Sequence, residues 1–280
     1  MRGWWQDLGD LVLPAECGGC GTPRTVLCPA CRAALTGAVP SRVRPVPEPL
    51  GLPVVHAATR YADEVRAVLL AHKERGALAL AGPLGTALAG AVRAGLDEPP
   101  PGRRGVLLVP VPSARRAVRA RGHDPARRIA LAAAGDLRAS GTPARVLAVL
   151  RQRRGVADQA GLNSRQRLDN LAGALSVAPG GGRLLAGAGA IVLVDDLMTT
   201  GASLAEAARA VREAVGGGEA AAGRREWEGE VGDVRRVGNA VYADVGREVR
   251  GQRGTGAAFG GMICAAVVAA APDSFEINWN

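Results

Sequence analysis

The stretch IVLVDDLMTTGAS, residues 191–203, decides the fold. Ile191–Val194 is an apolar run with the length and composition of a buried strand, and the acidic pair Asp195 and Asp196 follows it directly. In open α/β folds, ligands bind at the sheet edge formed by the carboxyl ends of parallel strands. Two adjacent carboxylates cannot share one apolar core, so we expect sugar hydroxyls and a hydrated Mg²⁺ ion as their partners.

A phosphate-binding loop is predicted directly after the acidic pair. Its residues offer successive backbone N–H groups, three hydroxyl groups and the positive end of a helix that begins near its glycine. These residues are Thr199, Thr200, Gly201, Ala202 and Ser203. An ordinary strand–turn–helix capped by threonine and serine is the alternative, and the preceding acidic pair disfavours it.

The whole string resembles the signature of type I phosphoribosyltransferases, which bind 5-phosphoribosyl-1-pyrophosphate (PRPP). The resemblance implies the fold of that family. It implies that Asp195 and Asp196 hold the ribose hydroxyls and stabilise positive charge at the anomeric carbon, while Thr199–Ser203 binds the 5′-phosphate. It indicates the ligand and leaves the reaction open, because some proteins of this fold bind PRPP only to regulate.

The pyrophosphate of PRPP is expected at a second loop, which follows the predicted strand VLLVPV. Pro112 completes a rigid turn there. Arg119 and Arg121 supply bidentate donors for phosphate beside Gly122, which permits close backbone approach. A basic surface helix is the alternative for these arginines. We expect His123 to hydrogen-bond the backbone and assign it no catalytic role.

Strand and helix patterns alternate along most of the chain. Strand-length apolar runs occupy 54–62, 106–111, 145–150, 190–196 and 263–270, and helix patterns occupy 64–74, 80–95, 125–138 and 201–215. Asp124 and Pro125 are the predicted N-cap and first residue of the third helix. The alternation predicts an α/β fold with a mostly parallel sheet whose two faces are covered.

Residues 1–39 are predicted to form a small zinc-binding module with an N-terminal helix. The module contains two Cys-x-x-Cys pairs separated by seven residues: Cys17, Cys20, Cys28 and Cys31. Four thiolates at this spacing suit a tetrahedral Zn²⁺ ion. Disulfides, an iron–sulfur site and a redox-active pair are the alternatives, and a reducing compartment disfavours the disulfides.

The rest of the chain divides into a linker and one larger domain. The Pro-rich residues 40–53 are predicted to be the linker, and residues 54–280 the domain. Residues 216–261 are rich in Gly, Arg and Glu without apolar periodicity, which predicts a flexible insertion. Cys264 lies in the last apolar run and is predicted to be a core residue.

Positive charge is concentrated in one region. The chain carries +9, and residues 103–167 alone hold fifteen arginines against three aspartates, a net charge of +12. This stretch suits phosphate-rich ligands or nucleic acid, and a solvated arginine-rich surface is the alternative. The chain has one lysine, Lys73. Either a compact ammonium group is needed at this position, or the lysine has been kept there by chance. No uninterrupted apolar run reaches about 18 residues, so we expect a soluble, cytoplasmic protein without membrane insertion.

The order of the motifs resembles the competence protein F (ComF) family. A four-cysteine module, a VPVP loop with R-x-R-G, a second R-x-R segment and the PRPP string follow one another. The second segment implies a flexible lid, with Arg151, Arg153, Gln159 and Arg165 at the matching places. Its arginines would screen the leaving pyrophosphate while the lid excludes water. The family carries an aromatic residue, Asn and Gln after Arg-Gly, where this chain has His-Asp-Pro.

The motifs and the resemblance lead to two hypotheses about function. The first is Mg²⁺-dependent transfer of the phosphoribosyl group from PRPP to an unidentified acceptor, through an oxocarbenium-like state that the acidic pair stabilises. The second, implied by the family resemblance, is a non-catalytic adaptor in DNA uptake and natural transformation. Such an adaptor would bind single-stranded DNA or DNA-processing proteins through the arginine-rich face and the zinc module.

Overall fold

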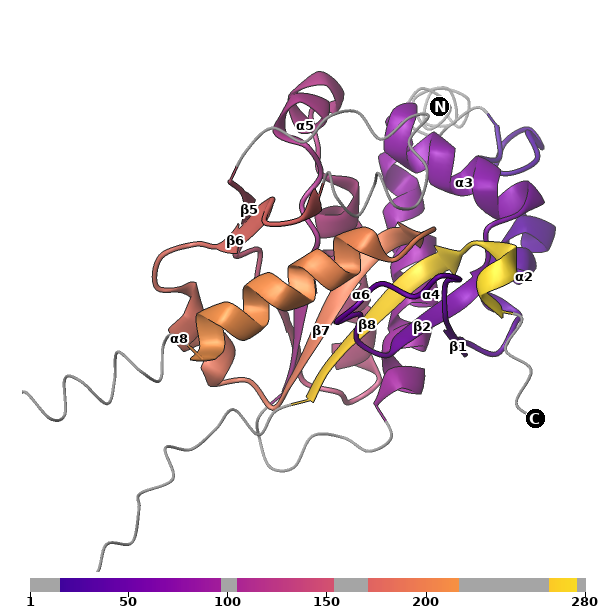
Figure 1. Cartoon of the computed structure of the whole chain (residues 1–280). Helices are drawn as coiled ribbons and strands as arrows, with labels where there is room; N and C mark the ends of the chain where they lie inside the picture. Colours follow the sequence, from indigo (N-terminus) through magenta and orange to yellow (C-terminus); the bar gives the residue numbers. More distant parts are fainter. Residues whose placement is uncertain (1–15, 97–104, 154–170, 217–261, 276–280) are drawn as a thin grey trace, which may run out of the picture.

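The computed structural model describes residues 16–96, 105–153, 171–216 and 262–275 (Figure 1). Six strands form the main sheet in the order β1-β2-β8-β7-β3-β4. Only β1 and β2 pair antiparallel, and the other four pairs are parallel. The bounds are β1 Ser41–Val43, β2 Val55–Arg60, β3 Val106–Pro110, β4 Ala144–Val146, β7 Ala190–Met198 and β8 Met262–Ala270. The prediction of an α/β fold with a mostly parallel sheet is confirmed.

Helices cover both faces of this sheet. The helices of the described residues are α2 Pro29–Thr36, α3 Asp63–Glu74, α4 Ala81–Gly95, α5 Arg115–Arg121, α6 Pro125–Ala139, α8 Gly181–Ala186, a helix at 202–216, and the 3-10 turns η1 Leu78–Leu80 and η2 Pro272–Phe275. α4 and α6 pack on one face and the helix at 202–216 on the other (Figure 1). Leu78–Gly95 is apolar and long enough to span a membrane, but half of it is buried within the protein as α4.

The central strand β7 separates two cores. Ile191 and Leu193 face the core under the helix at 202–216, while Val192 and Val194 face the core under α4 and α6. All four side chains are fully buried, which explains why this strand reads as a continuous apolar run. β7 extends to Met198, so the acidic pair lies within the strand, at its carboxyl end.

The parallel register brings three strand ends together at one edge. Val194 of β7 pairs with Pro110 of β3, and Asp195 pairs with Val267 of β8. The backbone N–H of Val111 then donates to the carbonyl of Val194 at 2.9 Å. The loop after β3 therefore begins directly beside the acidic pair.

The apolar run 145–150, predicted to be one strand, is divided between two sheets. Its first residues belong to β4, which pairs with β3 in the main sheet. A tight turn follows, in which the N–H of Val149 donates to the carbonyl of Leu147 at 3.0 Å. The chain then enters β5 (Leu150–Gln152), which pairs antiparallel with β6 (Leu175–Val177) in a separate sheet. The single-strand prediction is wrong because apolar composition does not show which partner a strand takes.

The cysteine-containing segment packs into the main core. Cys17 and Cys31 share one apolar cluster with Val68 of α3 and Leu80 of η1. The predicted linker contributes β1, which pairs with the edge strand β2. The predicted N-terminal helix and all but the first residue of the predicted insertion lie outside the described residues.

An ion pair between a buried glutamate and a half-exposed arginine joins the helix at 202–216 to the small sheet. Glu206 is 6% exposed and accepts a hydrogen bond from the N–H of Leu175 in β6 at 2.9 Å. Arg209 contacts both carboxylate oxygens of Glu206, at 2.8 and 2.9 Å, and donates to the carbonyl of Leu175 at 2.9 Å. Burial opposes ionisation, but these donors more than offset it and lower the pKa of Glu206. The ionised pair thus fixes the helix against β6.

Replacing Glu206 with alanine should lower the free energy of unfolding by about 1–3 kcal/mol, because a buried N–H loses its acceptor. Urea denaturation at neutral pH measures the change. Glu213→Ala is the matched control, since it removes a partner of Arg209 that is 67% exposed, and it should cost less than about 1 kcal/mol. Equal losses for the two variants would contradict the role given to Glu206.

Candidate functional site

A cleft of about 820 Å³ lies where the strand ends meet, and it brings together segments far apart in the sequence. Its walls come from α3, the loop after β3, α5, β5, β6 and the end of β7. They include Lys73, Val111, Pro112, Ser113, Arg116, Arg121, Gln152, Leu171, Leu175, Asp195, Asp196, Leu197, Thr199 and Ser203. This volume lies within the range of small-molecule sites.

The two members of the acidic pair occupy different environments. Successive residues of a strand face opposite sides of the sheet, so Asp195 and Asp196 diverge although both line the cleft. The side chain of Asp196 is 6% exposed and lies against Lys73, whose Nζ is 2.9 Å from Oδ2 and 3.2 Å from Oδ1. Oδ1 of Asp195 accepts the backbone N–H of Asp196 at 2.8 Å. Among the described residues, only Asp196 of the pair therefore has a cation against it.

Loss of solvation and repulsion from Asp196 raise the pKa of Asp195 well above its usual range, and Lys73 offsets only part of this effect. A carboxyl group in this state gains from any ligand that supplies a cation or a hydrogen-bond donor. The acidic pair is therefore suited to bind hydroxyl groups or a metal ion.

The predicted phosphate loop turns sharply into the helix at 202–216. Thr199 and Ser203 line the cleft, whereas Gly201 and Ala202 are buried beneath it. Gly201 has φ +72°, a conformation that favours glycine, and a Cβ there would lie 3.2 Å from the side chain of Leu52, which would have to shift. The carbonyl of Gly201 accepts the first helical hydrogen bond, from the N–H of Ala205 at 2.9 Å. The helix N-terminus thus opens at the cleft, beside the acidic pair.

The residues predicted for pyrophosphate are only partly brought together. Pro112 and Arg121 line the cleft. Arg119 instead lines an adjoining cavity of about 350 Å³, which also includes Pro112. Gly122 is the left-handed C-cap of α5, with φ 75°, so its conformation ends the helix. Arg121 is already engaged by Glu74.

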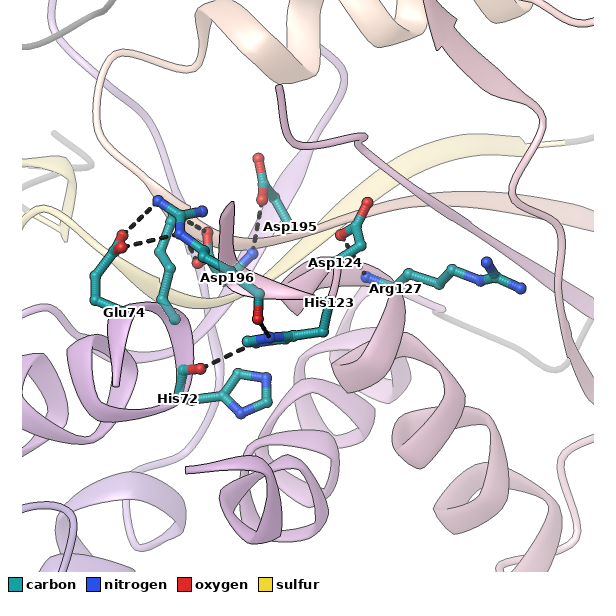
Figure 2. A network of polar contacts seen from close by, with 9 residues as sticks. His72, Glu74, His123, Asp124, Arg127, Asp195 and Asp196 are labelled. Carbon is teal, nitrogen blue, oxygen red and sulfur yellow. Dashed lines mark hydrogen bonds and ion pairs between the residues drawn. The ribbon is translucent and has the colours of Figure 1, made fainter. Parts of the chain in front are cut away.

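The last turn of α3 and the turn between α5 and α6 form a polar network (Figure 2). Arg121 donates to Glu74 twice, from Nε at 2.9 Å and from Nη2 at 2.6 Å. The ring nitrogens of the buried His123 lie 3.2 Å from the carbonyl of Arg121 and 3.2 Å from that of His72. His123 thus contacts backbone, as the sequence predicts. Asp124 caps α6 by accepting the N–H of Arg127 at 3.2 Å.

The predicted lid lies only partly within the described residues. Arg151 belongs to β5 and lines the smaller cavity, and Arg153 is exposed just after β5. Gln159 and Arg165 fall outside the residues that the structure describes.

Four cysteine sulfur atoms form a cluster that could hold a metal ion. The sulfurs of Cys17, Cys20, Cys28 and Cys31 all lie within 4.8 Å of one another. Tetrahedral zinc with Zn–S bonds of about 2.3 Å needs sulfurs roughly 3.8 Å apart, so the donor set fits after a slight contraction. All four are free thiols, which disfavours the disulfide alternative.

The local hydrogen bonds prepare two of these thiols for metal binding. Burial opposes ionisation of Cys17, but backbone donors, led by the N–H of Cys28 at 3.3 Å, lower its pKa to about 6. A hydrogen bond with Thr22 lowers the pKa of Cys20. Burial raises the pKa of Cys31, which stays a thiol unless a metal ion displaces its proton. The thiolate is the species that binds metal.

Two features of the cleft were not assigned to the site from the sequence. Lys73 stood out as the only lysine, and the structure places it against Asp196. Glu74 gave no signal, because its partner Arg121 lies 47 residues further along the chain. Cys264 is 3% exposed within β8, which confirms it as a core residue.

No protein-family model matches the chain, and the comparison with curated proteins gave no match. The fold class, the cleft and the cysteine cluster therefore stand on the structure alone. The resemblance of the motifs to phosphoribosyltransferases and to ComF proteins stays a prediction.

We expect the protein purified under reducing conditions to carry one zinc ion per chain, measured by metal analysis. Cys20→Ser should abolish the metal and lower the midpoint of thermal unfolding by more than about 4 °C, the effect of roughly 1–2 kcal/mol in a chain of this size. Cys264→Ser, which removes a thiol outside the cluster, should keep the metal. A metal-free wild type with oxidised thiols would contradict this assignment.

Asp195→Asn should make the ligand-free protein more stable at neutral pH. A carboxyl group whose folded-state pKa is raised contributes its full stability below the unfolded-state pKa and loses it as pH rises through the folded-state value. Asparagine keeps the acceptor for the N–H of Asp196 without ionising, so the melting midpoint at pH 7 should rise by about 2–4 °C. The gain should vanish in acid. Asp273→Asn, at an exposed position, is the control. A lower midpoint for Asp195→Asn than for the wild type would contradict the raised pKa of Asp195.

Proposed function

We propose that the cleft binds PRPP together with Mg²⁺. The observation that carries this proposal is the parallel register of β3 and β7, which sets the acidic pair, the loop at Thr199–Ser203 and the loop at Pro112 around one cleft. A sugar phosphate needs hydroxyl acceptors and an anion site at adjoining positions. The end of β7 supplies both within nine residues.

Each part of PRPP has a proposed place in the cleft. The 5′-phosphate lies at the backbone N–H groups and hydroxyls of Thr199–Ser203, at the positive end of the following helix. The ribose 2′- and 3′-hydroxyls donate to Asp195 and Asp196. The pyrophosphate lies by the rigid turn at Pro112, within reach of the arginines of α5.

The acidic pair supplies hard oxygen donors of the kind that a PRPP-bound Mg²⁺ ion prefers. When bound, Mg²⁺ would neutralise charge on the pyrophosphate leaving group. The other roles belong to residues of the chain. Asp195 and Asp196 stabilise positive charge at the anomeric carbon, and the phosphate loop holds the other end of the ribose in place. An acceptor nucleophile then displaces pyrophosphate.

A second candidate is the competence adaptor implied by the ComF resemblance. The observation that favours it is the row of exposed arginines on α5 and β5. Arg115, Arg116, Arg119 and Arg151 have no hydrogen-bond or ion-pair partner among the described residues. Such a surface suits the phosphates of single-stranded DNA, and binding through phosphates weakens steeply with salt. In this role, PRPP would act as a regulator of the adaptor.

Calorimetric titration with PRPP and Mg²⁺ tests the site. We expect binding by the wild type and a loss of at least about tenfold in affinity for Asp195→Asn/Asp196→Asn, equivalent to about 1.4 kcal/mol. Asp273→Asn controls for removal of a carboxylate elsewhere. Absence of binding by the wild type would overturn the proposal. Release of pyrophosphate with none of a panel of nucleobases, despite PRPP binding, would favour the adaptor.

A further inference from the structure

Two adjacent residues of α3, Lys73 and Glu74, each pair with one charged residue of the cleft, Asp196 and Arg121. Lys73 lies against the acidic wall, with Nζ 2.9 Å and 3.2 Å from the oxygens of Asp196. Glu74 lies against the basic wall, where it accepts two hydrogen bonds from Arg121 at 2.9 and 2.6 Å. One helix end therefore provides a cation for the carboxylate and a carboxylate for the guanidinium.

The two pairs differ in how strongly they are shielded from water. The side chain of Asp196 is 6% exposed and that of Lys73 is 33% exposed. Arg121 is 21% exposed and Glu74 is 45% exposed. The Lys73–Asp196 pair is consequently the stronger one, while water screens the pair of Glu74 and competes for it.

Backbone contacts hold the helix end in this position. The carbonyl of His72, the residue before Lys73, lies 3.2 Å from Nε2 of His123 (Figure 2). The other ring nitrogen of His123 lies 3.2 Å from the carbonyl of Arg121. One buried imidazole therefore joins α3 to the residue that Glu74 contacts. These contacts place the end of α3 beside the end of α5.

The chemistry of the two side chains matches the ligand groups expected at these walls. An ammonium group is a compact cation beside a carboxylate that is proposed to bind hydroxyls or Mg²⁺. A carboxylate that accepts a two-pronged bond from arginine uses the same donors that a phosphate would use. Lys73 and Glu74 thus present the charges of a metal ion and of a phosphate group, each to the wall that would receive it.

We infer that Lys73 and Glu74 are internal counter-ions that stand in for Mg²⁺ and pyrophosphate in the ligand-free cleft, and that they set the affinity and the metal dependence of PRPP binding. This inference rests on the proposed function. Binding of the ligand exchanges Glu74 for pyrophosphate at Arg121, and it lets Mg²⁺ share the acidic pair with Lys73. Both are positioning residues, because they act through Asp196 and Arg121.

The two charges have opposite effects on the ligand. Glu74 competes with pyrophosphate for Arg121, so its removal should tighten PRPP binding. Lys73 balances the charge of Asp196 even without metal, so its removal should leave this role to Mg²⁺. The protein without Lys73 should therefore depend more strongly on Mg²⁺. A residue that merely supports the fold would change affinity equally with and without the metal.

The test measures PRPP affinity by calorimetry, once with Mg²⁺ and once with EDTA. Glu74→Gln should bind about two- to fivefold more tightly, the range expected for release of a partly exposed ion pair. Lys73→Gln should raise the ratio of the two affinities on the order of tenfold. Lys73→Arg keeps the charge and should restore the wild-type ratio. Two controls remove the same charges from exposed positions of α3, Glu64→Gln and Arg66→Gln, and should leave both quantities unchanged.

The outcomes distinguish the counter-ion inference from the proposed function. If PRPP binds the wild type and neither Glu74→Gln nor Lys73→Gln departs from its control, the counter-ion inference is overturned and the proposed function stands. If neither the wild type nor any variant binds PRPP, both are overturned. Thermal unfolding checks that the variants are folded. Glu74 is exposed enough that Glu74→Gln keeps the inference testable even if Lys73→Gln does not fold.

Discussion

The parallel register of β3, β7 and β8 is the constraint on which the rest of the structure depends. Because Val194 pairs with Pro110 and Asp195 with Val267, three strands end at the same edge of the sheet. The segments that follow β3 and β7 both line the cleft. A shift of this register by one residue would reverse which side chains face each core and would move the acidic pair away from the loop after β3.

The same register places two carboxylates close together, and the chain provides a cation for one of them. It places two consecutive carboxylates at the end of a strand that is buried on both faces. Asp196 has Lys73 as its cation, and Asp195 has no such partner among the described residues. Burial and repulsion from Asp196 therefore raise the pKa of Asp195, and a bound ligand that supplies a cation would reduce this repulsion. Strain of this kind is common where a site is prepared for a ligand.

Much of the fold could be predicted from the sequence because its signals are local. Periodicity and capping residues predict β2, β3, α3, α4 and α6 to within about two residues, as the Asp124 cap of α6 illustrates. The acidic pair and the glycine at 201 likewise indicate the edge of the sheet. The clustering of the four cysteines was predicted correctly, because two Cys-x-x-Cys pairs in one short segment lie close together.

Features that depend on distant partners could not be predicted. The run 145–150 divides between two sheets, and only the positions of β3 and β6 determine where it breaks. Arg121 was expected to be open to a phosphate, but α3 brings Glu74 to it from 47 residues away. Lys73 was noticed for its rarity alone. Its contact with Asp196 spans 123 residues, which no local pattern reports.

A crystal structure with PRPP and Mg²⁺ tests the central claim most directly. We predict the 5′-phosphate at the backbone of Thr199–Ser203, the ribose hydroxyls at Asp195 and Asp196, and the pyrophosphate beside Pro112 with Glu74 displaced from Arg121. Density for the ligand at any other place on the protein, or a cleft that stays empty at saturating PRPP, would contradict it.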